Sequence, residues 1–520
     1  MKRQMHLGLF ILGTGSHVAG WRYPGAVDSF QNFSAIQEIG RIAERGKFDL
    51  IFMGDNLYAD AAAHPSYTLR LEPLTMLAAL STSTSHIGLG ATVSTTYSDP
   101  FTVARVFASL DHISHGRAAW NAVTTANPAT AANFGTIHPD HARRYEMASE
   151  FLDVVKGLWD GWADDAIVAD RVSGLYIDPT RLRPIDHDGA FFKVKGPLNI
   201  GRSPQGHPVV LQAGGSEAGQ ALAARTADIV FSVVQDMEEA KAGYASLKDR
   251  LPAFGRKAED VTVLPGVMPI VGRTDKEAFE KLNVLQSFVS GSNALAILSD
   301  RFGQDMSAYD LDGPIPDIAL PDSYHSFARV MLAKARRENM TLRDLYNLIA
   351  AARGHWVLCG SAISVADTLQ QWFEEHAADG FNVMPPYFHE GFEDFVQLVV
   401  PILQERFHAC RQFEFVDGFR EKIGSAGAER LFDVSHFRQR SDHDDGNVLG
   451  RRVRLEPLAH LIPAYFRHHD IKQDQVRLRL GHGVERLLAV IHHGNLVPLV
   501  GEVGVEELAI LMVVVGDQDF

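Results

Sequence analysis

The chain has 520 residues, of which 46% are hydrophobic and 22% are charged. This composition is ordinary for a globular protein with a large buried core, and it excludes a wholly disordered or collagen-like chain. The 49 Lys and Arg residues against 64 Asp and Glu residues give a net charge of −15. That balance argues against nucleic acid as the main partner, because phosphate backbones are bound by basic surfaces.

Cysteine content and hydropathy limit the cellular locations that we expect for the protein. Cys359 and Cys410 are the only cysteines, so neither a disulfide framework nor a cysteine-based zinc site is expected. The apolar segment 7–12 is short and interrupted by glycine, unlike a signal peptide. The apolar run 508–515 falls well short of the ~20 residues that span a bilayer. We therefore expect a cytoplasmic protein with no membrane partner.

Short apolar segments alternate with amphipathic ones up to about residue 400, a pattern typical of β/α units with a parallel sheet. The eight expected strands are His6–Leu12, Leu50–Met53, Ile87–Ala91, Arg117–Ala122, Pro208–Gln212, Ile229–Val233, Val261–Pro265 and Gly380–Met384. The helices expected between them include Phe30–Arg45, Pro100–Ile113, Ser216–Thr226 and Val365–His376. Eight such units predict an α/β fold, a closed (β/α)8 TIM barrel, over an open doubly wound sheet. A count of six or seven strands stays open.

Two stretches interrupt the repeat, and the end of the chain differs from the rest. Residues 160–202 are loop-like with a hairpin expected at Ala190–Val194, and residues 284–352 form a helical insertion expected to act as a lid. The predicted domains are a barrel over 1–406 and an atypical tail of unknown fold over 407–520. The tail is rich in histidine, which suits a metal-binding appendage. Because its histidines have no repeating spacing, we favour an accreted or out-of-frame extension.

Polar residues follow several predicted strands, where the active sites of barrels lie. His17 follows the first strand, although simple packing against Trp21 is equally open. Asp55 follows the second strand, where a capping or surface carboxylate is the alternative. The hydroxyls and amides of 94–97 and 121–125 could grip the polar edges of a heterocycle, although Ser98 or Asp99 of the intervening stretch could simply cap a helix.

A glycine-rich turn over 212–219 lies between a predicted strand and a predicted helix. Free backbone N–H groups at a helix start bind phosphate, and the turn lacks a full P-loop or dinucleotide fingerprint. It therefore fits a single mononucleotide phosphate, with a plain tight connection as the alternative. Tyr145 and the arginines before it could reach a phosphate. His355 could face a ligand, whereas the adjacent Trp356 suits the core.

Together these segments resemble the bacterial luciferase-like superfamily, and within it the group of nitrilotriacetate monooxygenase component A and dibenzothiophene-sulfone monooxygenase. The resemblance extends from about His6 to Arg406. The matching stretches are Ala43–Asp49, Ser94–Tyr97, Ala104–Thr125, Asn133–Gly135, Arg144–Tyr145, Gly196–Asn199, Gln212–Ser216 and Asp379–Pro386. The tail departs from this group, whose members normally end soon after a segment like 401–406.

The resemblance implies a TIM-barrel oxidoreductase: a monooxygenase that takes reduced FMN from a separate NAD(P)H-dependent flavin reductase. It implies that one atom of O2 enters a small organic substrate and that a C–N or C–S bond then breaks. It also implies a homo-oligomer. Two alternatives remain: a deazaflavin-dependent oxidoreductase of the same superfamily, and a flavin-binding protein without catalysis.

The resemblance also assigns residues. Those that match FMN contacts of the group are Asp55, Asn121, Thr124, Tyr145, Gly215 and Ser216. His17 matches an active-site histidine, and His355 a second one. No residue is expected to bind a metal. Thr14 stands where the long-chain alkane enzyme has cysteine, which makes an alkane a less suitable substrate. A cavity bordered by Asp55, Thr124, Tyr145 and Ser216 is therefore expected.

Overall fold

The computed structural model divides the chain into two compact units, Met1–Phe432 and Asp433–Phe520. The structure describes residues 3–27, 32–59, 69–289, 294–295, 298–299, 302–317, 325–352, 354–407, 488–492 and 495–499. In the second unit the described residues form an antiparallel pair, β12 (Leu488–His492) and β13 (Asn495–Leu499). The rest of the predicted tail lies outside the described residues, and the domain boundary at residue 407 stays a prediction.

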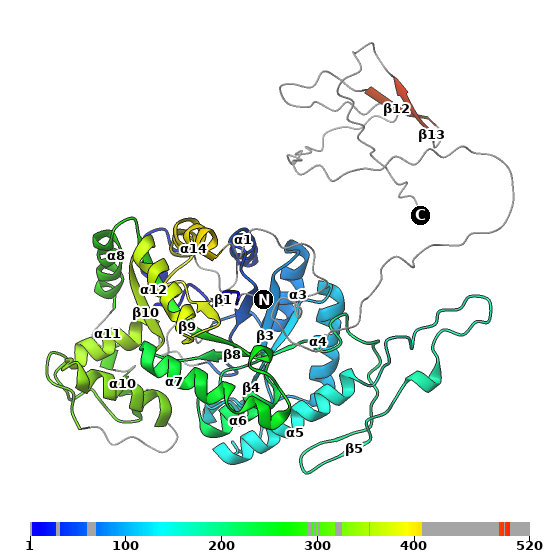
Figure 1. Ribbon diagram of the computed structural model, residues 1–520, viewed down its shortest axis with the longest axis horizontal. Helices are drawn as coiled ribbons and strands as arrows, with labels where there is room; N and C mark the ends of the chain where they lie inside the picture. The colour runs from blue at the N-terminus through cyan, green and yellow to red at the C-terminus, as the bar shows by residue number, and fades with distance from the viewer. Residues whose placement is uncertain are drawn as a thin grey trace. The chain divides into compact units, whose positions relative to one another are not determined.

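A closed parallel barrel of eight strands forms the centre of the first unit (Figure 1). Around the barrel the strands follow the order β1, β2, β3, β4, β7, β8, β9 and β11, and β11 pairs with β1 to complete the ring. They are β1 (His6–Ile11), β2 (Leu50–Met53), β3 (Gly88–Ser94), β4 (Ala118–Val123), β7 (Val209–Gln212), β8 (Ile229–Ser232), β9 (Thr262–Gly272) and β11 (Gly380–Val383). The predicted (β/α)8 barrel is confirmed.

A further strand, β10 (Trp356–Ser361), is not among the segments predicted from the sequence. It pairs in parallel with the outer half of β9, from Val267 to Gly272. The inner half of β9 pairs with β8 and β11 instead. Because Trp356 and Val383 both pair with Val267, the start of β10 lies level with the carboxyl end of β11. The residue before β10 therefore reaches the mouth of the barrel.

Side chains of the strands alternate between the barrel interior and the surrounding helices, as the period of two in a β-strand requires. In β1, Leu9 and Ile11 belong to the core between strands and helices. Phe10 and Leu12 belong to the apolar cluster in the barrel interior. This cluster also contains Leu50 and Phe52 of β2. Both faces of the strands are therefore buried, which explains their near-continuous apolar sequences.

Helices surround the barrel (Figure 1). In α1, buried isoleucines recur at 36, 39 and 42, and the Asn32 side chain accepts the N–H of Ala35 as the cap. The helices are α1 (Phe33–Arg45), α3 (Pro73–Leu80), α4 (Pro100–Ser114), α5 (His141–Trp159), α6 (Glu217–Thr226), α7 (Met237–Lys248), α8 (Asp275–Ser287), α10 (His325–Arg337), α11 (Leu342–Ala352), α12 (Ala362–Glu374), α13 (Glu390–Asp394) and α14 (Val400–Phe407).

The two predicted interruptions of the repeat are present. Between α5 and β7 the chain forms a projecting arm with a short hairpin of β5 (His187–Asp188) and β6 (Lys193–Val194) (Figure 1). Between β9 and β10 the insertion has its own apolar core, which includes Phe302, Met331 and Tyr346. Within the described part of the chain, no helix has the length and apolar character needed to cross a membrane.

Candidate active site

The loop after β1 is held against the loop after β11. The N–H groups of Ser16 and His17 donate to the carbonyls of Pro385 and Pro386, at 2.8 and 3.2 Å. Gly15 has a φ of +122°, and a Cβ there would overlap the Pro386 carbonyl, so this contact requires glycine. The strand-end loops of β1 and β11 therefore form one rigid side of the mouth.

His17 lies at this contact with its side chain fully buried. The backbone N–H of Ala19 donates to His17 Nδ1 at 3.0 Å. This bond makes Nδ1 an acceptor, so the neutral ring carries its proton on Nε2. The neighbouring Val18 packs against the core of the insertion. His17 thus lies where the barrel mouth meets the insertion.

A cavity of about 250 Å³ opens at the carboxyl ends of β1, β2 and β8. Its lining combines aromatic and aliphatic residues with polar ones: Phe10, Leu12, Gly54, Asp55, Asn56, Arg70, Phe231 and His355. Two residues that the sequence predicted for the site, Asp55 and His355, therefore meet at one cavity although 300 positions separate them.

Asp55 lies two residues after the end of β2. Its Oδ1 accepts the N–H of Asn56 at 2.8 Å. Burial raises the pKa of Asp55 to about 6, while the Asn56 hydrogen bond and the positive charge of Arg70 act in the opposite direction. A carboxyl group that changes charge near neutral pH inside a strand-end cavity is typical of a functional site.

His355 stacks on Phe231 of β8, with ring centroids 4.8 Å apart. Phe231 in turn contacts the rings of Phe10 and Phe52, each at 5.6 Å. These rings give the cavity an apolar aromatic wall. Such a wall suits the flat face of a heterocycle better than a charged ligand group.

A second polar group lies at the carboxyl end of β7. Ser216 caps α6, because its Oγ accepts the Gly219 N–H at 3.1 Å, and the same hydroxyl lies 3.5 Å from the Tyr145 hydroxyl on α5. A Cβ on Gly214 would approach Gly219 at 3.0 Å and the Tyr145 hydroxyl at 3.1 Å. Gly215 is exposed, and a Cβ there would meet no atom within 4 Å. The turn is therefore closely packed at Gly214 and open to solvent at Gly215.

The end of β4 contributes hydrogen-bonding groups between these two areas. Asn121 Nδ2 donates to the hydroxyl of Thr92 at 2.9 Å, which leaves Asn121 Oδ1 buried without a protein donor. The Thr124 carbonyl accepts the Thr96 hydroxyl at 2.9 Å. An unsatisfied buried acceptor costs about 1–3 kcal/mol, so a ligand N–H at Asn121 would recover free energy.

Apart from His17, at the contact between the loops after β1 and β11, the predicted site residues lie at three places on one edge of the barrel. Asp55 and His355 share the cavity, Tyr145 and Ser216 touch at the turn, and Thr124 directly follows β4. Thr124, Tyr145 and Ser216 are not among the described residues that line the cavity at Asp55, and a single cavity bordered by all four residues stays a prediction. The capping alternative is confirmed for Asp99, which accepts the Thr102 N–H at 2.9 Å.

Sequence reasoning missed Arg70 and the aromatic wall. Phe10 and Phe231 lie inside predicted strands, where an apolar residue indicates core and nothing more. Arg70 lies just before α3, outside every matching motif, and no local pattern distinguishes it from an exposed loop arginine. Only the closure of the barrel brings these side chains to one cavity.

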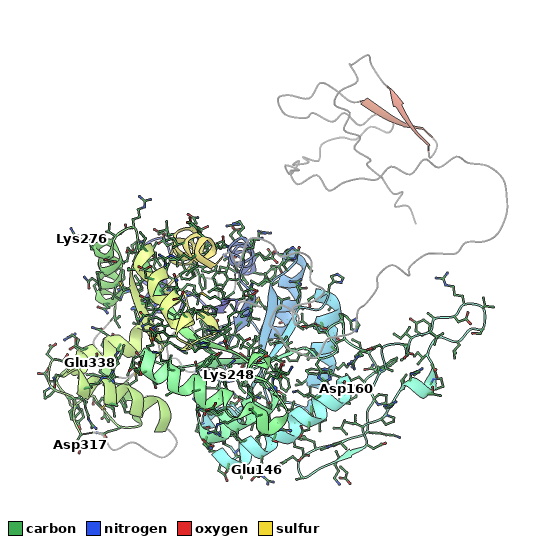
Figure 2. The ribbon with its side chains drawn as sticks, in the orientation of Figure 1. Glu146, Asp160, Lys248, Lys276, Asp317 and Glu338 are labelled. Carbon is green, nitrogen blue, oxygen red and sulfur yellow. The ribbon has the colours of Figure 1, made fainter. Side chains whose placement is uncertain are left out.

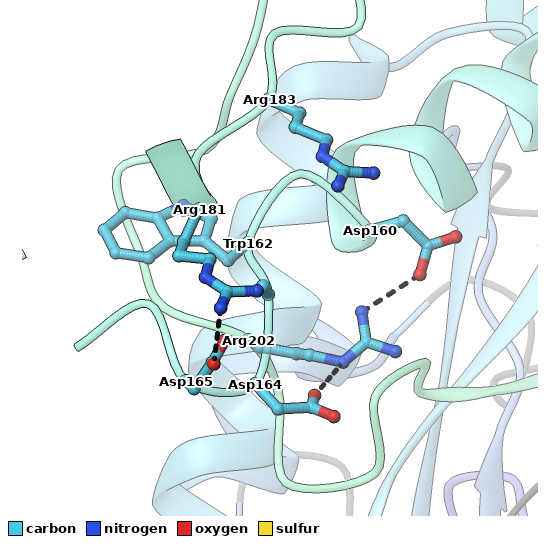
Figure 3. Close-up of a pocket in the computed structure, with 8 residues that line it drawn as sticks. Asp160, Trp162, Asp164, Asp165, Arg181, Arg183 and Arg202 are labelled. Atoms are coloured by element: carbon cyan, nitrogen blue, oxygen red, sulfur yellow. Dashed lines mark hydrogen bonds and ion pairs between the residues drawn. The ribbon is translucent and has the colours of Figure 1, made fainter. Parts of the chain in front are cut away.

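A larger hollow of about 470 Å³ lies elsewhere (Figure 3). Ion pairs cross it, from Arg202 to Asp160 at 3.0 Å and to Asp164 at 2.7 Å, and from Arg181 to Asp165 at 3.3 Å. Although burial opposes this, hydrogen bonds from His207 and Arg202 lower the pKa of Asp160 to about 2. Most of the charged side chains that line this hollow are therefore paired with one another.

The hollow is also remote from the mouth. Asp160 caps the carboxyl end of α5, whereas Glu146, next to Tyr145, lies near the start of the helix (Figure 2). At a rise of 1.5 Å per residue, Tyr145 and Asp160 are about 22 Å apart along the helix axis. None of the predicted site residues lines this hollow, so we place the active site at the mouth.

A closed parallel barrel whose strand-end loops surround a cavity at its mouth is the architecture of the TIM-barrel class. The family model described as luciferase-like monooxygenase matches residues 5–380. The chain belongs to this family, and it is a monooxygenase.

Individual relatives agree with this assignment. The chain is 45% identical over 418 residues to N-acetyl-S-(2-succino)cysteine monooxygenase of Bacillus subtilis (strain 168), covering 79% of this chain and 95% of the relative. It is 45% identical over 421 residues to nitrilotriacetate monooxygenase component A of Aminobacter aminovorans, covering 78% and 93%. The crystal structure of long-chain alkane monooxygenase (LadA) superposes with a TM-score of 0.72 at 31% identity, covering 83% and 98%.

The described residues contain no group of three or more His, Cys, Asp and Glu side chains that could hold a metal ion. Most of the histidine-rich tail lies outside those residues. Both interpretations of the tail, a metal-binding appendage and an extension without a selected role, therefore stay predictions.

Proposed function

We propose that this chain is the oxygenase component of a two-component system. It takes reduced FMN from a separate NAD(P)H-dependent flavin reductase and uses O2 to oxygenate a small organic molecule, with cleavage of a C–N or C–S bond. The observation that carries the proposal is the division of the mouth into an aromatic cavity beside β1, β2 and β8 and an open polar turn after β7.

The two areas fit the two ends of FMN. The turn offers the hydroxyls of Tyr145 and Ser216 and the exposed backbone of Gly215 at the start of α6, which suits a phosphate. Asn121 Oδ1 supplies a buried acceptor for a ring N–H. Apolar walls at Phe10 and Phe231 suit the flat faces of the flavin ring.

When bound, reduced flavin supplies the electrons that let O2 react with a closed-shell substrate. The chain itself binds, orients and excludes water. The apolar core of the insertion contacts Val18 beside His17 and can keep water from the mouth. The Nε2–H that the Ala19 hydrogen bond favours makes His17 a proton donor at that atom.

The relatives' names support the bond types. N-acetyl-S-(2-succino)cysteine is a thioether with C–S bonds, and nitrilotriacetate is a tertiary amine with C–N bonds. Each places a heteroatom beside a carbon that can be oxygenated. The same chemistry at the mouth of this barrel would give a hydroxylated carbon next to sulfur or nitrogen, from which the bond breaks.

The decisive experiment is an anaerobic titration of the purified protein with photoreduced FMN, followed by addition of oxygen. We expect saturable binding of reduced FMN, and oxygen uptake that yields a cleaved product when a substrate is present. Binding of a reduced deazaflavin in place of FMN would contradict the proposal. Ordinary FMN binding with no product from a broad panel of amines, thioethers and sulfones would favour a protein without catalysis.

A further inference from the structure

We propose that the tip of the projecting arm, residues 166–177, is a docking surface for a second copy of this chain. The arm leaves the barrel between α5 and β7 (Figure 1). The inference is independent of the proposed function, because none of the residues at the barrel mouth belongs to the tip.

The tip exposes large apolar side chains to water. Val172 is 98% exposed and Tyr176 is 66% exposed, and Ile167, Val168 and Leu175 are exposed as well. Single exposed apolar residues are common on protein surfaces, whereas a group of them close together marks an interaction site. Burial of this group against a partner would therefore contribute favourable free energy to the association.

Hydrogen bonds give the tip a defined structure. Two antiparallel segments face each other, since the Val168 N–H donates to the Tyr176 carbonyl at 3.0 Å and the Asp170 N–H donates to the Leu175 carbonyl at 2.9 Å. The Asp170 carboxylate orders the turn between them by accepting the Val172 N–H at 2.9 Å. An ordered backbone presents the apolar side chains, so binding costs little conformational entropy.

The charge of the tip suits contact with another copy of this acidic chain. Residues 166–177 contain one acidic residue, Asp170, and one basic residue, Arg171, so the tip has no net charge, whereas the whole chain carries −15. Two copies of a strongly acidic chain repel each other over much of their surfaces. A neutral apolar tip is a place where two copies can meet without that repulsion.

The position of the arm separates this surface from the delivery of flavin. In a (β/α)8 barrel, a connection from a helix to the next strand lies at the amino ends of the strands, opposite the mouth. The arm is such a connection, because it joins the carboxyl end of α5 to the start of β7. A reductase that hands reduced FMN to the mouth would bind at the other end of the barrel, which favours a second copy as the occupant.

Twofold symmetry supplies the contact area that one tip lacks. A stable interface takes roughly 800 Å² and about 20–30 residues from each partner, more than residues 166–177 offer. In a twofold assembly each copy contributes its own tip and also the surface that receives the partner's tip, so two tips enter the same contact. An unrelated partner would meet only one tip.

The experiment measures the mass of the full chain in solution by analytical ultracentrifugation over a range of concentrations. We expect wild-type protein to form a dimer or a larger even-numbered assembly. Val172→Glu and Tyr176→Glu should each raise the dissociation constant at least tenfold, with a circular dichroism spectrum like that of wild type. Ile363→Glu places the same charge at an exposed apolar position of α12 and should assemble as wild type does.

Amide hydrogen exchange tests the contact without any substitution. In wild-type protein, exchange at residues 166–177 should be slow when the chain is concentrated and faster after dilution. A monomeric wild-type chain at tens of micromolar would overturn the inference, and so would unchanged assembly of both glutamate variants. Exchange at the tip that is insensitive to dilution, or that slows only when flavin reductase is added, would show that a second copy does not cover it.

Discussion

His355 stacks on Phe231 almost face to face, with the ring planes only 10° apart. The backbone of β9 passes beside both rings at Gly266. A Cβ at this position would overlap His355 Nδ1 and lie 2.7 Å from Phe231 Cε2. The absence of a side chain at Gly266 is therefore what allows the histidine, which precedes β10, to reach the barrel mouth.

Gly266→Ala should displace His355 from the cavity. We expect a turnover at least tenfold lower and a free energy of unfolding lower by about 1–3 kcal/mol, the usual cost of overpacking. Turnover assays and urea unfolding check both effects. Gly243→Ala is the matched control, because a Cβ there meets nothing within 4 Å and alanine favours the helix. Wild-type turnover in Gly266→Ala would show that the position of His355 does not matter for the reaction.

Asp55 makes the stability of the protein depend on pH. Its pKa in the folded chain is about 6, above the ordinary value of 3.8. The contribution of Asp55 to the free energy of unfolding is therefore fully present below pH 3.8 and is lost as the pH rises through 6. The reason is that burial in the folded chain makes the ionised carboxylate less favourable than it is in the unfolded chain.

Asp55→Asn should stabilise the fold most at high pH. We expect a gain in unfolding free energy of up to about 3 kcal/mol at pH 8 and roughly half of that at pH 5. Urea unfolding at both pH values measures it, with the exposed Asp249→Asn as control. FMN affinity should fall in the same variant. An equal effect at both pH values would show that burial does not shift this carboxyl group.

The barrel could be predicted from the sequence because both faces of each strand are buried. The apolar runs at 50–53 and 209–211 are therefore continuous and end sharply. β10 could not be predicted in this way, because it pairs with an extension of β9 beyond the ring, and its residues are only partly buried. No pattern in the local sequence predicts that pairing.

The candidate site was predictable where a residue lies in the loop just after a strand, as Asp55 does two residues after β2 and Ser216 four residues after β7. Arg70 was not, because the segment that carries it belongs to no strand end or helix pattern. Its place at the cavity is set by tertiary packing and not by the identity of neighbouring residues.

Arg117, before β4, is a buried cation with no carboxylate at its hydrogen-bonding atoms. Its guanidinium donates to the carbonyls of Ser114, Ile87, Ser81 and Thr84 and to the Thr84 hydroxyl, at 2.7–3.1 Å. Burial lowers its pKa. The side chain thus ties the end of α4 to the residues between α3 and β3.

Arg117→Met keeps most of the volume and removes all of these donors. We expect a loss of about 3 kcal/mol or more in unfolding free energy, because several buried carbonyls are left unpaired. Chemical denaturation measures the loss. The exposed Arg105→Met on α4 tests the loss of an arginine without burial and should stay within about 0.5 kcal/mol of wild type. Equal behaviour of the two variants would refute the structural role of Arg117.

His17→Ala should separate catalysis from cofactor binding. We expect substrate turnover to fall by about 10²-fold or more, the usual range for loss of a general acid or base. The affinity for reduced FMN should stay within threefold of wild type, because the polar turn at Ser216 is untouched. His17→Gln, which keeps an N–H donor and much of the volume, should recover part of the turnover. Full activity in His17→Ala would exclude a role in proton transfer.

Ser216 caps α6 and is proposed to bind the FMN phosphate. One substitution with a matched control can separate these two roles. Ser216→Ala removes the cap of α6 and the hydroxyl beside Tyr145. We expect a loss of about 1 kcal/mol in stability from the cap. FMN affinity should also fall by about tenfold, which is about 1.4 kcal/mol. Thr274→Ala removes the equivalent cap of α8, where Thr274 accepts the Glu277 N–H at 3.2 Å. It should cost similar stability without loss of affinity. If both variants bind FMN equally well, Ser216 only caps its helix and the phosphate lies elsewhere.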